Sequence, residues 1–435
     1  MNSSPHPRTA ARRAAIEALV AVERDGAVLN AALERGGSAP FARELAAGVM
    51  RNRALIDWTL ASLLKKPLEK LDAPIRAILR CACLERAWLQ TPPQAVGNEY
   101  AGLARALKLS SASGLVNAIA RRLPDTPRTP PSEKKAALHL ATKFSHPQWL
   151  VERWLKRLGF DECGTLLEAN NQRAALAVRV NDLKTSRDEV RSNLAALELN
   201  VRESELSPLA LLVEDAGSPL NWPQWTLGEV IAQDEAAQLV SIEAAPQPGQ
   251  TVLDLCAAPG GKSTHCAQIM KNEGRVVACD VAPGRVKLIT QNAERLGLSI
   301  IEPRTADALA VNEPQADVVL LDAPCLGSGT LRRRPEARWN KTPEQLCELV
   351  GLQRALLTAA ARLVKPGGIL IYSTCSLEAE ENSEQAAWFL TKFPDWRGEP
   401  QEFLPALRTP EGWLQTWPHR DGCDGMFCAR FRAPA

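Results

Sequence analysis

The hydrophobic pattern changes character along the chain, and its first part has the spacing of helices. Between residues 8 and 122, apolar side chains recur at every third or fourth position, as in Ile16, Leu19 and Val20. That spacing places them on one face of a helix, and prolines separate one such stretch from the next. We therefore expect residues 1–125 to form an all-α bundle.

A Pro-rich polar stretch follows the bundle, and we expect residues 126–143 to be a linker. Shorter apolar runs then predict a small α+β module over residues 144–235. Its expected elements are a helix from Phe144, a strand at 177–180, a helix at 186–197 and a strand at 209–214. The module resembles an RNA-recognition-like fold only loosely, because its strands lack an obvious pair of stacking aromatic residues. We expect it to bind RNA or to cap the neighbouring domain.

The last part of the chain alternates between short β-branched runs and helical stretches. The expected strands are 251–255, 275–279, 300–303, 317–321 and 369–373, with helices at 284–296 and 343–364 and a final edge strand at 426–431. Such alternation predicts a doubly wound parallel sheet, so we expect residues 236–435 to form a Rossmann-like α/β domain. A ligand of this fold binds where the strands end, near the point at which the strand order reverses.

A turn of small residues follows the first of these strands and leads into a helix. Its members are Cys256, Ala257, Ala258, Pro259, Gly260, Gly261 and Lys262. Small side chains let a ligand approach the backbone, and the helix N-terminus offers free N–H groups to an anionic group. The turn is neither a dinucleotide fingerprint nor a P-loop, so neither a dinucleotide nor a triphosphate is the expected ligand. The alternative is an ordinary strand-to-helix turn.

Carboxylates stand at the ends of the following strands. Asp280 lies 20 residues after Gly260, the spacing at which a carboxylate reaches ribose hydroxyls in such folds. Asp307 follows the third strand, where it could accept a hydrogen bond from an adenine amino group; the alternative role is a helix N-cap. These positions favour a nucleoside-containing cofactor.

Two cysteines follow the ends of the last two parallel strands. Cys325 comes after Asp322-Ala-Pro, and Cys375 stands in Ser-Thr-Cys-Ser. A single buried cysteine is usually a small core residue, but two at the edge that binds the ligand favour nucleophilic chemistry. Exocyclic amine methyltransferases instead need an Asp/Asn-Pro-Pro-aromatic strand end, which this chain lacks.

Together the motifs Cys-Ala-Ala-Pro-Gly-Gly-Lys, Asp-Ala-Pro-Cys and Ser-Thr-Cys-Ser resemble those of the RNA cytosine-5 methyltransferases that use S-adenosylmethionine. The helical N-terminal part resembles the RNA-binding antitermination factor NusB, a combination similar to bacterial enzymes of small-subunit (16S) ribosomal RNA. The resemblance implies that Cys375 attacks carbon 6 of the cytosine and that Cys325 assists release of the product. It also implies that the turn, Asp280, Asp307 and Asp322 contact the cofactor, while Lys262 adds positive potential near the thiolate.

The distribution of charge supports a polyanionic partner. The 435 residues carry a net charge of +2, but residues 1–145 hold 22 Lys and Arg against 12 Asp and Glu, a net of +10. The remainder holds 30 against 38, a net of −8. We expect the basic third to hold ribosomal RNA, naked or in an early assembly particle; the alternatives are a solvated face or a protein-docking module.

The glycine- and arginine-containing stretch 327–341 adds a second basic region, and we expect it to be a loop over the RNA backbone. The chain has 11 scattered cysteines, no C-x-x-C pair, no secretory signal and no membrane-length apolar run. We therefore expect no metal, a cytoplasmic monomer and no membrane contact. A non-enzymatic RNA chaperone, assembly factor or antitermination factor is the alternative to an enzyme.

Overall fold

The computed structural model describes residues 7–35 and 39–435, so residues 1–6 and 36–38 of the expected bundle lie outside the described residues. The chain divides into two compact units. The helical unit comprises Met1–Gln172 and Leu331–Lys341, and the sheet unit comprises Arg173–Thr330 and Thr342–Ala435. The chain therefore passes from one unit to the other three times.

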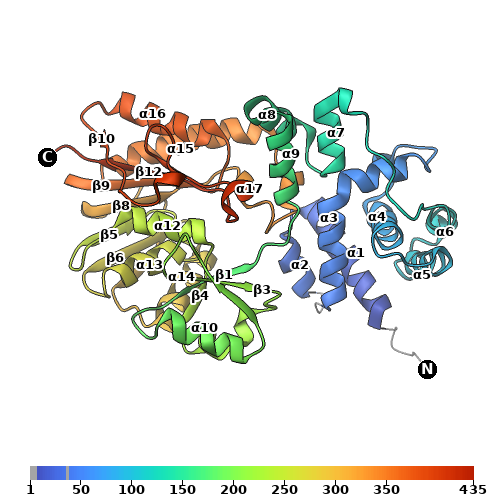
Figure 1. Cartoon of the computed structure of the whole chain (residues 1–435), viewed down its shortest axis with the longest axis horizontal. Helices are drawn as coiled ribbons and strands as arrows, with labels where there is room; N and C mark the ends of the chain where they lie inside the picture. Colours follow the sequence, from blue (N-terminus) through green and yellow to red (C-terminus); the bar gives the residue numbers. More distant parts are fainter. Residues whose placement is uncertain (1–6, 36–38) are drawn as a thin grey trace. The chain divides into compact units, whose positions relative to one another are not determined.

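The helical unit confirms the expected all-α part (Figure 1). Its helices are α1 (Pro7–Asp25), α2 (Leu29–Arg35), α3 (Pro40–Ala61), α4 (Ala73–Ala87), α5 (Pro93–Ala106), α6 (Ser113–Ala120), α7 (Ala136–Lys143), α8 (Gln148–Leu158) and α9 (Phe160–Ala169). Proline stands at the start of α1, α3 and α5, where the missing N–H costs no hydrogen bond. Ile16, Leu45 and Ile78 are buried in one common core.

The region after the bundle differs from the expectation. The stretch 126–143 contains helix α7, in which Leu140 and Ala141 are buried. Helices α8 and α9, the first part of the module expected over residues 144–235, group with the helical unit. The sequence did not predict α7, because the prolines before it indicated a linker. The helix has only eight residues, which are too few to show a clear helical period.

A small antiparallel sheet begins the sheet unit. Its elements are β1 (Leu176–Val180), α10 (Arg187–Ala196), β2 (Asn200–Glu203), β3 (Ala210–Glu214), α11 (Pro223–Thr226) and β4 (Val230–Ala232), with strand order β2-β3-β1-β4. Strands β1 and β3 and helix α10 match the expected elements. The pattern missed β2 because no residue in it is fully buried, and β4 because it has three residues.

The large sheet confirms the expected Rossmann-like domain. Its strands are β5 (Thr251–Asp254), β6 (Arg275–Asp280), β7 (Ile301–Thr305), β8 (Ala316–Asp322), β9 (Val364–Thr374), β10 (Arg397–Gly398), β11 (Leu414–Gln415) and β12 (Phe427–Arg432). Their order is β10-β12-β9-β8-β5-β6-β7, with β11 paired to β12 outside this series, and β5 to β9 run parallel. Strand β12 lies between β9 and the two-residue β10 and is antiparallel to both. It is therefore not the edge strand that we expected.

Helices cover both faces of this sheet (Figure 1). They are α12 (Glu235–Ala244), α13 (Gly261–Ile269) and α14 (Pro283–Leu296) on one face, and α15 (Pro343–Ala361) and α16 (Ser383–Lys392) on the other. Successive strand residues point to opposite faces, so Val252 joins the first core and Leu253 the second. None of the described helices is long and apolar enough to cross a membrane.

Candidate active site

The strand order reverses between β5 and β8, and a cavity of about 490 Å³ opens there at the carboxyl ends of the strands. Its volume lies in the range of small-molecule sites. Of the residues singled out in the sequence, those that line it are Cys256, Ala258, Asp280, Asp307, Asp322, Cys325 and Cys375. The five expected parallel strands therefore each contribute residues after their carboxyl ends to this one cavity.

The other members of the glycine turn do not line this cavity and instead shape the turn behind it. Gly260 has a φ of +99°, and a Cβ there would lie 3.3 Å from the Cα of Ile289. Only glycine accommodates both constraints. Ala257 donates its N–H to Cys279 O (2.8 Å), Pro259 O accepts from Asn292, and Gly261 begins α13. These contacts fix the turn to β6 and α14.

Asp280 ends β6 and is held in place by its neighbours. Its Oδ2 accepts the N–H of Ala258 (3.3 Å) and lies 3.3 Å from Arg285 Nη1, while its Oδ1 accepts the N–H of Ala282 (3.1 Å). Arg285 also donates to Ala258 O (2.8 Å). The carboxylate thus joins the cavity wall to the glycine turn.

Asp307 lies on the cavity wall but begins no helix. Its Oδ1 accepts the N–H of Leu309 (2.9 Å), which closes a local turn. The side chain therefore holds a local turn and is not the helix cap that we gave as its alternative role. Beside it the apolar Leu309, Leu352 and Leu356 line the cavity, and the sequence pattern had not singled them out.

Asp322 joins the glycine turn to the strand that precedes Cys375. Its Oδ2 lies 2.7 Å from Lys262 Nζ, and its Oδ1 accepts from Ser373 Oγ (2.8 Å). Burial alone would lower the pKa of Lys262, but the Asp322 carboxylate outweighs it and the pKa is raised. Negative charge on Cys375 raises it further, so Lys262 stays an ammonium beside that sulfur.

The two cysteines meet at the end of the paired strands β8 and β9. Asp322 and Ser373 are register partners, so Cys325 and Cys375, three and two residues further on, leave the sheet side by side. Their Sγ atoms are 3.4 Å apart. The hydrogen bond to Cys375, and then burial, raise the pKa of Cys325 well above that of an ordinary thiol. Cys325 therefore remains protonated when Cys375 carries a negative charge.

Two buried charged residues near the turn were missed by sequence reasoning. Asp254, at the end of β5, accepts from Ser263 (2.6 Å), and burial raises its pKa to about 6. Arg179, on β1, is completely buried and donates to Gly261 O (2.8 Å) and Thr264 Oγ1 (3.0 Å). The sequence signal for Arg179 was an arginine in the middle of an apolar strand. A charged side chain is almost never fully buried unless other groups pair with it, so such an arginine indicates buried partners.

The basic stretch 327–341 is not the open loop that we expected. Its part Leu331–Lys341 belongs to the helical unit, where Arg338 is completely buried. Arg338 donates to Asn171 Oδ1 (2.7 Å) and to the carbonyl oxygens of Asn170 (3.0 Å) and Ser145 (3.1 Å). Trp339 donates to Met50 O (3.0 Å). An arginine can donate to buried protein oxygens as well as to RNA phosphates, and sequence alone does not distinguish the two uses.

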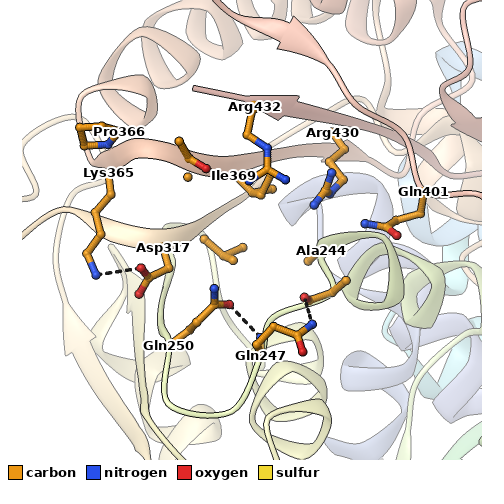
Figure 2. Close-up of a pocket in the computed structure, with 14 residues that line it drawn as sticks. Ala244, Gln247, Gln250, Asp317, Lys365, Pro366, Ile369, Gln401, Arg430 and Arg432 are labelled. Atoms are coloured by element: carbon orange, nitrogen blue, oxygen red, sulfur yellow. Dashed lines mark hydrogen bonds and ion pairs between the residues drawn. The ribbon is translucent and has the colours of Figure 1, made fainter. Parts of the chain in front are cut away.

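A second cavity of about 360 Å³ opens at the opposite, amino-terminal edge of the sheet (Figure 2). Lys365 Nζ lies 2.9 Å from Asp317 Oδ1 in this cavity. Arg430 and Arg432 also line it, and both pair with Glu399. Its charged groups thus have partners within the protein, the two arginines sharing one carboxylate, and no cysteine lines it. Within the described ranges, no cluster of His, Cys, Asp and Glu could hold a metal ion.

Models of known protein families match three successive parts of the chain. The family described as "16S rRNA methyltransferase RsmB/F" matches residues 241–432, the NusB family matches 9–125, and an RsmF/B-like ferredoxin-like domain matches 146–219.

Similar proteins extend over nearly the whole chain. The probable ribosomal RNA small subunit methyltransferase B of Bacillus subtilis is 33% identical over 98% of this chain and 99% of its own length. That of Synechocystis is 36% identical over 90% of both. The crystal structure of PH0851 has a TM-score of 0.85 at 32% identity and covers 99% of both chains.

Proposed function

From the premise that this chain belongs to the RsmB/F family of 16S rRNA methyltransferases, we propose that it methylates carbon 5 of a cytosine in small-subunit ribosomal RNA through a covalent cysteine adduct. The observation that carries the proposal is the pair of thiols 3.4 Å apart beside the cavity at the strand ends. Cytosine carbon 5 is a poor nucleophile, and methylation there needs a covalent activator.

S-adenosylmethionine is the cofactor of this protein, and when bound it supplies an electrophilic methyl group on a sulfonium ion. The cavity fits it, because its volume of about 490 Å³ suits a small molecule and its wall combines leucines with the carboxylates of Asp280, Asp307 and Asp322. We assign the ribose hydroxyls to Asp280, at the end of β6. The carboxylates match the positive charge of the ligand.

Cys375 is the proposed nucleophile. Its thiolate forms a bond to carbon 6 of the cytosine, and the electron pair of the 5,6 double bond becomes available at carbon 5. Carbon 5 would then bond to the methyl carbon that the bound cofactor would supply, and the electron pair of the broken methyl–sulfur bond would stay on the sulfur of the cofactor. Lys262, held by Asp322, favours the thiolate by its positive charge.

Cys325 is the proposed base for release. Once the Cys375 sulfur is bonded to carbon 6 it is a neutral thioether and a weaker hydrogen-bond acceptor, so the hydrogen bond that raises the pKa of Cys325 is weakened. Cys325 can then lose its proton to water and take the proton of carbon 5. The electron pair of that C–H bond restores the 5,6 double bond and expels the Cys375 thiolate.

We further propose that the helical unit holds the ribosomal RNA and that the protein works as a monomer in the cytoplasm. The net charge of +10 over residues 1–145 supports contacts with phosphates. All 11 cysteines, which lie in the described part of the chain, are free thiols, as a reducing compartment would keep them.

The experiment that tests the proposal combines product and intermediate. Small-subunit ribosomal RNA incubated with the protein and S-adenosylmethionine should yield 5-methylcytidine, detected by mass analysis of its nucleosides. The Cys325→Ala variant should accumulate a denaturant-resistant protein–RNA band that Cys325→Ala/Cys375→Ala lacks. Methylation at an exocyclic amine, or tight RNA binding without methyl transfer, would contradict the proposal and favour the corresponding alternative.

A further inference from the structure

Two neighbouring buried residues, Glu381 and Asn382, hold the backbones of the two cysteine loops. Glu381 ends the short turn Ala379–Glu381 after β9, and Asn382 leads into α16. Both side chains lie inside the protein, with 0% and 1% of each residue exposed. Neither residue was singled out by the sequence motifs, and the mechanism above uses neither.

Glu381 holds the loop that carries Cys325. Its Oε1 accepts the N–H of Leu326 (2.9 Å), the residue after the cysteine. The same oxygen accepts from Gln353 Nε2 (2.9 Å), which also donates to Pro324 O (2.9 Å), the residue before the cysteine. Glu381 and Gln353 therefore fix the peptide groups on both sides of Cys325.

Asn382 holds the loop that carries Cys375. Its Nδ2 donates to Ser376 O (2.8 Å), and its Oδ1 accepts from Thr374 Oγ1 (2.5 Å). These two partners are the residues directly after and before Cys375. The two residues are consecutive in the chain, so both cysteine loops, whose sulfurs lie 3.4 Å apart, are hydrogen-bonded to one dipeptide.

We propose that Glu381 and Asn382 are positioning residues with separate duties, Glu381 for release of the product by Cys325 and Asn382 for attack by Cys375. The inference deepens the proposed function and rests on it. A reacting group displaced by a fraction of an ångström loses rate steeply, so each residue should control the step of the cysteine that it holds. Glu381 is completely buried, so water does not compete for its hydrogen bonds to the loop.

The test measures the two steps separately in each variant. In small-subunit ribosomal RNA transcribed with 5-fluorocytidine, carbon 5 carries no proton to lose, so the appearance of the denaturant-resistant adduct reports attack and methyl transfer alone. In ordinary RNA, the decay of the adduct after a chase with unlabelled RNA reports release. We expect Glu381→Ala to slow release about tenfold and Asn382→Ala to slow adduct formation about tenfold, each with little effect on the other step.

Conservative and double variants separate positioning from general damage. Glu381→Gln keeps an oxygen that can accept from Leu326 and Gln353, so it should retain most of the release rate. Gln353→Ala should slow release as Glu381→Ala does. In the Cys325→Ala background, Glu381→Ala should add no further loss of release, because it acts through the missing thiol.

A matched control is Glu243→Ala, which removes another completely buried glutamate of the sheet unit, one that pairs with Arg408 (2.7 Å). It should lower the melting temperature without changing the balance of the two steps. Equal slowing of both steps by Glu381→Ala, or a full additional loss on Cys325→Ala, would overturn the proposal. If instead the wild-type protein forms neither adduct nor 5-methylcytidine, it is the proposed function that fails.

Discussion

The large sheet has a cavity at its amino-terminal edge and another at its carboxyl-terminal edge, and carboxylates near the two cavities are held in opposite ways. At the amino-terminal edge, hydrogen bonds from Arg432 and Arg430 lower the pKa of Glu399. Burial would raise the pKa of Asp317, but the Thr251 N–H and Lys365 outweigh it. Beneath the carboxyl-terminal edge, burial dominates and raises the pKa of Asp254 to about 6.

In this sheet, the charges that stabilise the fold and the groups that can react lie at opposite edges. At the amino-terminal edge Lys365 pairs with Asp317, and Arg430 and Arg432 share Glu399, which favours the folded state. At the carboxyl-terminal edge, Cys325 is kept protonated by its neighbour Cys375, and Lys262 stands beside the second sulfur. Perturbed groups of this kind gather at functional sites. Variants at the two edges should therefore fail in different assays.

The largest effect should come from the carboxyl-terminal edge. Cys375→Ala removes the proposed nucleophile, so we expect methyl transfer to fall by roughly 10⁴-fold or more while cofactor affinity stays unchanged. Transfer of labelled methyl groups to ribosomal RNA, with calorimetry for the cofactor, measures both. Cys347→Ala, which removes an exposed thiol on α15, is the control and should keep full activity. A Cys375→Ala protein with wild-type turnover would remove the distinction between the edges.

A smaller effect is expected where the cofactor is held. Asp280→Ala removes the carboxylate assigned to the ribose hydroxyls, and hydrogen bonds to a charged group are worth about 1.5–3 kcal/mol. The dissociation constant for S-adenosylmethionine should therefore rise roughly tenfold to hundredfold. Asp317→Asn, at the other edge, should leave that constant unchanged. Equal losses of affinity in the two variants would show that the effect on binding is not local.

The smallest effect should appear at the amino-terminal edge and only in stability. Because the pKa of Glu399 is lowered on folding, its contribution is fully present above about pH 4.3, the ordinary carboxyl pKa, and is lost as the pH falls through the lowered value. Glu399→Gln should cost about 1 kcal/mol at pH 7. The melting temperatures of variant and wild type should converge in acid, and methyl transfer should not change. A constant difference from pH 7 to pH 3 would contradict this account.

The sequence was sufficient for the fold wherever the hydrophobic period was long. The parallel strands were placed to within a few residues, because buried β-branched runs such as that before Cys256 have few other uses. Helix α7 and strands β2 and β4 were missed, since eight, four and three residues give no reliable period. The course of β12 beside β10 depends on a pairing between distant residues that no local pattern records.

For the candidate site, the sequence supplied the residues at the strand ends but not their supports. The positions of Cys325 and Cys375 followed from two motifs placed at neighbouring strand ends. Arg338 was misjudged, because a buried and an RNA-binding arginine look alike in one sequence. Glu381 and Gln353 act through hydrogen bonds to loop backbones, and a motif of side-chain types does not reveal such partners.

The path of residues 331–341 also limits how this protein can be divided. A fragment ending at residue 172 would contain every helix from α1 to α9 yet lack Arg338, and the acceptors at Ser145, Asn170 and Asn171 would be left inside it without their donor. A fragment cut at residue 172 would thus lack a buried segment of its own unit. An added peptide spanning 331–341 would be the natural complement that restores it.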